Sequence, residues 1–460
     1  MKTKITNWGN YPAIESELYH FRTEEELKKL IELPSVIARG NGRCYGDSSL
    51  APFVLSTLHF NKALSFDTES GIFECEGGML LDDILQIIVP RGWFLPVSPG
   101  TKYITVGGAI ASNIHGKNHH IDGTFCRHVL EMDVLTADGN IYTCTPYQQS
   151  DLFHATCGGM GLTGIILRAK FYLKRIETSY IRQTQIKARD LFEILDLFET
   201  YRSQPYTMAW IDCLKRGKHF GRSIMMMGET ASYEQLKQSQ ITSALAIHPQ
   251  KHISFPVNMP SFVLNPFSMK AFNQAFYMKN WKKELRNIVH YDPFFYPLDK
   301  ILHWNRGYGK KGFIQYQFVL PLENSKNGLI DILKRINRYG IGSFLAVLKL
   351  FGKDESFFSF PMEGYTLALD FPMKQGLLPF LDQLDRIVLD YGGRLYLTKD
   401  ARMKADVFWK SYPNAAAWYE IMIKYNKGYK FRSSQSDRLE ITVPANTKNY
   451  ANSTHIGSHF

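Results

Sequence analysis

The chain has 460 residues, of which 45% are hydrophobic and 21% charged. This length suits two or three domains, each with its own core, and the composition is that of an ordinary soluble globular protein. The net charge of +11 fits either a solvated basic surface or attraction to anionic lipid, a phosphorylated substrate or nucleic acid. Nucleic acid ranks last, because the sequence has no arginine-rich block and no nucleic-acid-binding motif.

The cysteines and the N-terminus indicate the compartment. No two of the six cysteines form a CxxC pair, so we expect neither a disulfide framework nor a zinc site, and a reducing environment fits. The first 16 residues lack the apolar run of a signal peptide, and no stretch of about 18 apolar residues occurs. These features predict a cytoplasmic protein, with peripheral contact at the inner face of the membrane left open.

The first third combines short strands with glycine clusters. Eighteen of the 34 glycines precede residue 170. Apolar runs at 36–38, 71–76, 129–136 and 165–173 predict strands, and the Asp138-Gly139 turn predicts a hairpin within 125–145. Residues 80–89 have helical spacing. We therefore predict a mixed α+β unit over residues 1–178 in which the glycine clusters form functional loops.

A second α+β unit is predicted over residues 179–392. Helices are expected at 190–203, 233–247, 328–338 and 375–390, and strands at 312–320, 343–351 and 365–371. The basic stretch 270–286 interleaves aromatic residues with lysines, which suits a helix with one wet face or a membrane surface. A segment at 393–442 returns to a strand-turn pattern followed by helices, and the polar tail 443–460 is expected to be disordered.

The first glycine loop, Ala38 to Ser48, has the spacing GxGxxxG. That is one residue longer than a Rossmann fingerprint, and the following residues, with Pro52, lack the period of a helix. A phosphate at this loop would therefore be held by backbone N–H groups in a nest. A plain structural turn is nearly as good an explanation.

The second and third loops add specificity. In the second loop, Gly107 and Gly108 precede small residues that let a backbone lie flat against a ligand. The histidines that follow, at 115, 119 and 120, could suggest a metal, but no carboxylate or cysteine stands at ligand spacing. The third loop has four glycines within 158–164. Taken alone, this loop is explained by a bulged structural turn. Three such loops about 60 residues apart together suggest one long cofactor.

These segments resemble a known family. IARGNGRCYGD, PGTKYITVGGAIASNIHGKNHH, LTADG, CGGMGLTGII, FIQYQF, LKLFG and GGRLYLTKDAR are similar to motifs of the FAD-binding PCMH-type, or vanillyl-alcohol oxidase, family. The similarity is strongest to the branch that oxidises polyprenyl-phosphate-linked pentoses. The resemblance implies a two-part FAD-binding domain with an inserted α+β substrate domain.

The resemblance assigns the cofactor contacts residue by residue. Arg43 stands where covalent members of the superfamily carry a flavin-bearing histidine, so we expect non-covalent FAD. The implied FAD-binding residues are Ala38, Arg39, Gly40, Asn41, Gly42, Arg43, Cys44, Tyr45, Gly46, Asp47, Ser48, Gly100, Thr105, Val106, Gly107, Gly108, Ser112, Asn113, Ile114, His115, Ile166 and Tyr396.

The resemblance also implies catalytic roles for Lys399, Tyr45 and His115. Removing hydride from an alcohol carbon requires loss of the O–H proton, which a lysine of lowered pKa or a neighbouring tyrosine can accept. Gln315 and Gln317 alternate with apolar residues on a strand, so both can face one pocket. The implied substrate-binding residues are Lys117, Gln315, Gln317, Lys349 and Thr366.

Several functions stay open on the sequence. The leading hypothesis is oxidation of a sugar hydroxyl to a ketone as the first half of an epimerisation, which a short-chain-dehydrogenase-type reductase would complete. The alternatives are an aldonolactone oxidase and a flavoprotein-like binding protein without catalysis. Thr366-Leu367-Ala368 departs from the Asn-x-Cys segment of the resembling branch, which leaves both the sugar and its lipid open.

Overall fold

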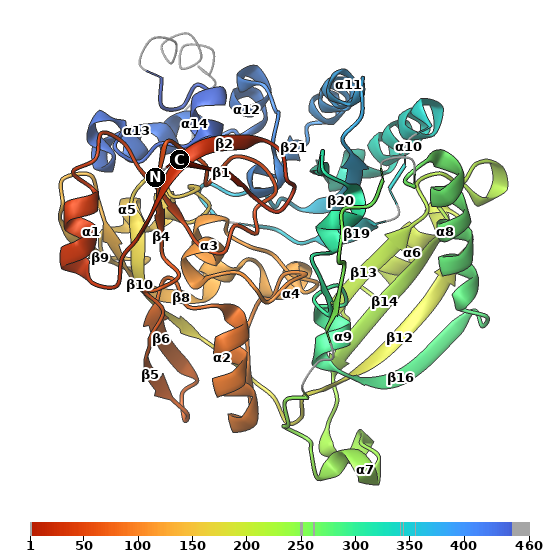
Figure 1. Ribbon diagram of the computed structural model, residues 1–460. Helices are drawn as coiled ribbons and strands as arrows, with labels where there is room; N and C mark the ends of the chain where they lie inside the picture. The colour runs from red at the N-terminus through yellow and green to blue at the C-terminus, as the bar shows by residue number, and fades with distance from the viewer. Residues whose placement is uncertain are drawn as a thin grey trace.

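The computed structural model describes residues 2–248, 252–260, 263–340, 342–343, 345–354 and 356–443. The described residues form a mixed α/β structure in which two smaller sheets lie beside a large antiparallel sheet (Figure 1). The tail from residue 444, for which disorder is expected, lies outside the described residues.

The first unit contains a four-stranded and a five-stranded sheet. The four-stranded sheet has the order β1-β2-β4-β3 and the five-stranded sheet the order β5-β6-β10-β8-β9. The expected hairpin at Asp138-Gly139 is confirmed as β8 paired antiparallel with β9. The strands are β1 Lys2–Thr6, β2 Ala13–His20, β3 Ile37–Arg39, β4 Phe53–Ser56, β5 Ala63–Asp67, β6 Ile72–Glu76, β7 Trp93–Phe94, β8 Val129–Leu135, β9 Ile141–Cys144, β10 Ile165–Tyr172 and β11 Lys174–Arg175.

Short helices connect these strands. The helix expected at 80–89 is confirmed as α2, whose buried Leu81, Ile84, Leu85 and Ile88 follow the 3.6-residue period. The second glycine loop opens α3, where the side chain of Thr105 accepts a hydrogen bond from the Gly108 N–H. The helices are α1 Glu24–Leu30, α2 Leu81–Ile88, α3 Val106–Ala111, α4 His119–Asp122 and α5 Ser150–Thr156.

The large sheet has eight strands in the order β16-β12-β14-β13-β19-β20-β18-β21. All neighbouring pairs are antiparallel. The strands expected near 312–320, 343–351 and 365–371 are confirmed as β18, β19 and β20, which are neighbours in this sheet. The strands are β12 Tyr180–Ala188, β13 Tyr206–Ile211, β14 Ser223–Thr230, β16 Glu284–His290, β18 Phe313–Pro321, β19 Ala346–Phe351, β20 Gly364–Pro372 and β21 Arg394–Leu395; a separate parallel pair is β15 Ile253–Ser254 with β17 Ile301–Leu302.

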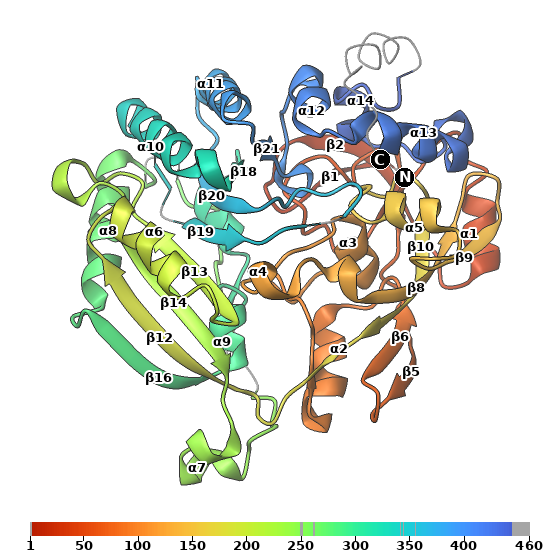
Figure 2. The same cartoon turned by 180° about the vertical axis from the view of Figure 1, so that it is seen from behind.

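Helices cover the large sheet and then return to the first unit. The expected helices near 190–203, 328–338 and 375–390 are α6, α10 and α11. The last helices, α12 to α14, lie over the first unit in both views (Figures 1 and 2). The helices are α6 Leu191–Thr200, α7 Gln238–Ile241, α8 Pro266–Lys279, α9 Tyr291–Phe295, α10 Leu322–Tyr339, α11 Leu377–Asp390, α12 Ala405–Ser411, α13 Ala415–Tyr425 and α14 Ser434–Arg438.

The helix expected at 233–247 is wrong for most of its length. Only a 3-10 turn at Tyr233–Gln235 and the four-residue α7 form, and Leu236 between them has an extended backbone. Leu236 and Ala244 pack together with Tyr180 in a small buried cluster. This tertiary packing explains why the apolar spacing does not produce a continuous helix.

The two faces of the large sheet differ in chemistry. In β18, Ile314, Tyr316, Phe318 and Leu320 belong to the main hydrophobic core with residues of α10 and α11. Because side chains alternate along a strand, Gln315 and Gln317 lie on the opposite face. The same alternation puts Lys349 of β19, and Thr366 and Asp370 of β20, on that polar face.

Candidate functional site

The glycine loops expected to share a cofactor lie against one another. Gly40 of the first loop approaches Thr105 of the second so closely that an added Cβ would collide with the Thr105 hydroxyl. The Gly158 N–H of the third loop donates to the Ile110 carbonyl at 3.0 Å, and Met160 donates to Ala111 at 2.9 Å. The three loops therefore build one continuous surface.

Part of this surface is open enough for a ligand. A Cβ added at Gly100 would have no atom within 4 Å, and one at Gly108 would meet only the Thr105 hydroxyl, at 3.0 Å. Residues 38–44, Gly107 and Gly108 are partly accessible although the neighbouring strands are buried. Such a glycine-lined backbone surface fits a long flat cofactor such as FAD.

The side chains of the first loop mostly bind the protein itself. Arg39 donates to the Thr6 carbonyl at 2.8 Å and to the Asn7 side chain. Asn41 donates to the Tyr103 carbonyl at 2.8 Å. The Arg43 guanidinium lies 4.1 Å from the Trp8 ring centroid, and burial lowers its pKa. Among the charged side chains of this loop that are partly accessible, Arg43 is therefore the one without a hydrogen bond to the protein within the described residues.

The first loop is joined to the C-terminal segment. The Tyr45 N–H donates to the Thr398 carbonyl at 3.0 Å, and Gly46 touches the Asp400 backbone so closely that no Cβ would fit. These contacts bring Tyr45 next to Lys399. The Lys399 ammonium lies 3.8 Å from the centroid of the Tyr45 ring.

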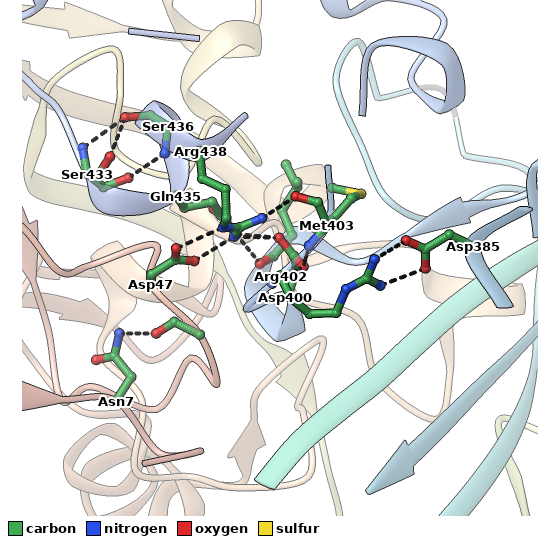
Figure 3. Close-up of polar contacts among 12 residues, drawn as sticks. Asn7, Asp47, Asp385, Asp400, Arg402, Met403, Ser433, Gln435, Ser436 and Arg438 are labelled. Atoms are coloured by element: carbon green, nitrogen blue, oxygen red, sulfur yellow. Dashed lines mark hydrogen bonds and ion pairs between the residues drawn. The ribbon is translucent and has the colours of Figure 1, made fainter. Parts of the chain in front are cut away.

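An ion-pair network, here named the clamp, holds this junction (Figure 3). Arg438 of α14 donates to Asp47 at 2.7 and 3.0 Å and to Asp400 at 2.8 Å. Arg402 pairs in turn with Asp385 of α11. Burial alone lowers the pKa of Arg438, but the carboxylates of Asp400 and Asp47 raise it overall. The Asp47 side chain is therefore committed to Arg438 and does not face the glycine-lined surface.

His115 and the polar face of the sheet meet at the second loop. The Gln317 amide donates to His115 Nε2 at 3.1 Å and to the Thr366 hydroxyl at 3.2 Å. Burial lowers the pKa of His115, and the nearby Lys349 adds to the effect. A neutral imidazole that accepts at Nε2 carries its proton on Nδ1, and this buried nitrogen has no hydrogen-bond partner among the described residues. His115 thus offers a free donor inside the site, as a ligand-binding residue would.

Tyr396 links the C-terminal segment to the same place. Its hydroxyl donates to the Ser112 carbonyl at 3.0 Å. Its ring stacks on Phe360, with centroids 4.5 Å apart, and lies 5.0 Å from the His115 ring. Ile166 is buried behind the loops, where its carbonyl backs directly onto Gly77.

Lys399 lies in an environment that favours its neutral form. Burial lowers its pKa to about 7, the Asp370 carboxylate opposes this effect, and Lys349 adds to it. Burial likewise lowers the pKa of Lys117 to about 7 and that of Lys349 to about 8. Within the part of the chain that the structure describes, Lys349 and Lys399 form no ion pair closer than 4 Å. The site therefore holds three lysines whose environment favours loss of their protons.

Asp370 is a site residue that the sequence analysis missed. It accepts hydrogen bonds from Gln315 at 2.7 Å and from the Tyr308 hydroxyl at 3.0 Å. Burial raises its pKa to about 6. The sequence does contain a pattern that points to Asp370. It follows Thr366 by four residues on the same strand, so both side chains leave that strand on the same side.

Lys117 is held differently from the other lysines. Its ammonium donates to the Phe295 carbonyl at 3.2 Å and lies over the rings of Phe294 and Phe295. The second unit thus fixes a side chain from the second glycine loop.

Among the described residues, no group of three or more His, Cys, Asp or Glu side chains could hold a metal ion. All six cysteines have free thiols. None of the described helices is long and apolar enough to cross a membrane.

Comparison with known proteins agrees with this geometry. The profile of the FAD binding domain family matches residues 18–145. The chain is 37% identical over 421 residues to decaprenylphosphoryl-beta-D-ribose oxidase of Mycolicibacterium smegmatis, covering 88% of this chain and 89% of the relative. L-gulonolactone oxidase of Bos taurus is 26% identical over 45% of this chain and 48% of its own length. Cytokinin dehydrogenase 9 of Oryza sativa is 31% identical over 30% of this chain and 28% of its own length.

Proposed function

The chain belongs to the family of FAD-dependent oxidoreductases that includes decaprenylphosphoryl-beta-D-ribose oxidase, and on that premise we propose that it oxidises a sugar hydroxyl to a ketone on a polyprenyl-phosphate-linked pentose. The relative is similar over almost its whole length, whereas the gulonolactone oxidases align over less than half of theirs. The observation that carries the proposal is the placement of Lys399 between Tyr45 and Asp370, beside the surface of the glycine loops.

Lys399 is the group that accepts the proton. With a pKa of about 7, a large fraction of the side chain is neutral at neutral pH and able to take the proton of the sugar hydroxyl. Bound FAD supplies the acceptor for the hydride that leaves the alcohol carbon. Tyr45 holds the lysine against its ring, and its own pKa is raised by burial, so Tyr45 remains a protonated hydrogen-bond donor.

The remaining polar groups orient the sugar. Gln315 and Gln317 present amides from one face of β18, and His115 adds the unpartnered Nδ1–H. Lys349 is close enough to Lys399 and to Lys117 to lower the pKa of both, and this group of ammonium side chains suits a sugar phosphate. The Thr366 hydroxyl accepts a hydrogen bond from Gln317 and so holds that amide in place.

The proposed roles of the domains follow their order along the chain. We propose that residues 1–178 and 393–442 bind FAD and that residues 179–392 form an inserted substrate-binding domain. Two contacts support this assignment: the Arg438–Asp47 pair and the Tyr45–Thr398 hydrogen bond both connect the first and last segments. β21 of the last segment nevertheless pairs with β18, so the two parts share one strand of the large sheet.

The binding of FAD is proposed to be non-covalent. No histidine stands in the first glycine loop, and Arg43 lies against Trp8 where a covalent attachment would need a nucleophile. A separate reductase would complete an epimerisation, and a lipid-linked substrate would require peripheral contact with the inner face of the membrane. An aldonolactone oxidase is the second candidate, supported by the partial similarity to L-gulonolactone oxidase.

One experiment separates the candidates. The purified protein should be yellow, and acid should release intact FAD into the supernatant. Anaerobic mixing with a short-chain prenylphosphoryl ribose should bleach the flavin absorbance, whereas gulono- and arabinono-lactone should not. Bleaching by the lactones alone would favour the second candidate, and a protein without bleaching by any sugar would argue for a binding role.

A further inference from the structure

Helix α8 carries large apolar side chains on its outward side as well as on its inward side. The inward side buries Met269 and Asn273, and Asn280 is buried directly after the helix. The outward side exposes large apolar side chains, with 81% of Phe267, 47% of Phe272 and 61% of Met278 accessible. A surface helix of a globular protein normally turns its apolar side inward. The large apolar side chains left exposed therefore indicate that the outward side of α8 meets something other than water.

The inward contacts fix this orientation. Asn273 donates to Asp212 at 2.9 Å, and Asn280 donates to Gln185 at 2.9 Å. Between them Phe276 packs on Trp210, with centroids 4.8 Å apart. Rolling the helix to hide its exposed apolar side would break both of these hydrogen bonds.

The exposed apolar side continues past the helix. Trp281, two residues after α8, is 78% exposed, and Lys282 lies over its ring at 4.6 Å. Before the helix, Ile253 and Val257 are 65% and 63% exposed. Phe267, Phe272, Met278 and Trp281 are named here the α8 face.

The charged side chains of the segment that carries the α8 face have one sign. The sequence from Gln235 to Lys283 contains six lysines and neither aspartate nor glutamate. Lys270, Lys279 and Lys282 are exposed, whereas Lys283 pairs with Glu193. Aromatic and aliphatic side chains flanked by lysines are typical of a helix lying in the interface of an anionic bilayer. A second copy of the chain fits less well, because a symmetric contact would bring the same lysines together.

The α8 face lies on the same side of the sheet as the site. Trp210, which contacts α8, pairs with Val347 in β19, and Val347 shares a face with Lys349. Leu264, just before α8, packs against the cluster of Tyr45, Tyr308 and Phe313. In both views α8 lies at the outer edge of the large sheet (Figures 1 and 2).

We propose that the α8 face is a docking surface for a bilayer that contains anionic lipid. Phe267, Met278 and Trp281 insert among the lipids, and Lys270, Lys279 and Lys282 contact the headgroups. The suggestion that docking serves to deliver a lipid-linked sugar rests on the proposed function, but the docking itself does not.

The test uses the full-length, FAD-loaded protein and vesicles without substrate. Flotation with vesicles of phosphatidylcholine and phosphatidylglycerol should recover the protein, and vesicles of phosphatidylcholine alone should recover much less. The triple variant F267S/M278S/W281S should bind at least about tenfold more weakly. The matched control is Tyr147→Ser, which removes a 95% exposed aromatic ring from the first unit and should bind as the wild type does.

A charge variant tests the second half of the proposal. K270E/K279E/K282E should lose binding to the anionic vesicles, and added salt should weaken the wild type in the same way. Unchanged flotation of the triple serine variant, or an equal loss in Tyr147→Ser, would overturn the docking surface. A dimer in sedimentation velocity that only the serine variant abolishes, without any loss of vesicle binding, would assign the face to self-association instead.

Bleaching by a soluble short-chain substrate keeps the two proposals apart. The α8 variants should bleach at the wild-type rate in the absence of vesicles, because no site residue is altered. Absence of bleaching together with normal flotation would reject the proposed function and leave the docking surface intact. Normal bleaching together with unaltered flotation of the serine variant would reject the docking surface and leave the proposed function intact.

Discussion

Two buried charged regions lie next to each other in the C-terminal segment, and they are built on opposite principles. In the clamp, Arg438 contacts both Asp47 and Asp400, and Arg402 pairs with Asp385. One residue away from Asp400, Lys399 lies over the aromatic ring of Tyr45, and the more distant Asp370 is its counter-charge. Pairing raises the pKa of Arg438 and burial lowers that of Lys399.

This difference separates stability from reactivity. A fully paired buried cation keeps its proton and fixes the chain, whereas removal of its partner leaves a costly bare charge. A buried lysine without a close acid gives up its proton readily and becomes a base. The clamp fixes Asp400 in position, and it thereby fixes the neighbouring Lys399. The weak interactions of the Lys399 side chain would not hold it in this buried position.

The largest expected effect is on activity, through Lys399→Met. Without its proton acceptor, the rate of flavin reduction should fall about 1000-fold in anaerobic stopped-flow measurements. The control is Lys404→Met, which alters an exposed lysine paired with Asp382 and should change the rate less than twofold. A Lys399→Met enzyme within about threefold of the wild type would show that another group takes the proton.

The same variant should not lose stability. The pKa of Lys399 lies near 7 in the fold and at its ordinary value of 10.5 when unfolded. Above pH 10.5 Lys399 is therefore neutral in both states and does not change the free energy of unfolding. As the pH falls from 10.5 towards 7, it increasingly destabilises the folded protein. At neutral pH, Lys399→Met should melt at the wild-type temperature or above it.

Arg438→Met should show the reverse pattern. Asp47 and Asp400, both buried, would lose their shared cation, and we expect a loss of about 3–5 kcal/mol in the free energy of unfolding. Urea unfolding of the FAD-loaded protein measures it. Arg432→Met is the matched control, because its pair with Asp437 is substantially exposed and should contribute less than about 1 kcal/mol. Equal losses in the two variants would contradict the contrast between the regions.

The sequence predicts those features that depend on local patterns. The 3.6-residue period of α2 and the Asp138-Gly139 turn between β8 and β9 are encoded within a few residues. The alternation in β18 is also local, and it correctly groups Gln315 with Gln317. The failure at 233–247 has the opposite cause, because contact with Tyr180 decides the backbone at Leu236.

The charged groups of the site depend on contacts that no local pattern reveals. Asp47 and Arg438 are 391 residues apart in the chain, so the first glycine loop alone could not show that the aspartate is committed to an ion pair. The role of Asp370 depends on its interactions with Tyr308 and Lys399, which come from other segments of the chain. The order of the eight strands is likewise set by long-range pairing, as β13 beside β19 demonstrates.

A smaller effect is expected for Asp370→Asn. The substitution keeps the shape of the side chain but loses one of the two hydrogen bonds from Gln315 and Tyr308, so flavin reduction should slow about tenfold. The rate should rise with pH through about 7 in the wild type, as Lys399 loses its proton. Because Asp370 raises the pKa of Lys399, the asparagine variant should move this acid limb to lower pH. A merely structural role would lower the rate without moving the limb.

The smallest expected effect is that of Lys349→Met, which should shift the acid limb of the pH profile in the direction opposite to Asp370→Asn. Lys349 lowers the pKa of Lys399 by charge repulsion, so its removal should let Lys399 keep its proton to higher pH. The acid limb of flavin reduction at saturating substrate should move upward by less than about one unit, and KM should rise. Lys353→Met, at an exposed position near the end of the same strand, should leave the limb in place. Opposite shifts for Asp370→Asn and Lys349→Met would identify Lys399 as the titrating base, whereas shifts of the same sign would assign the limb to a different group.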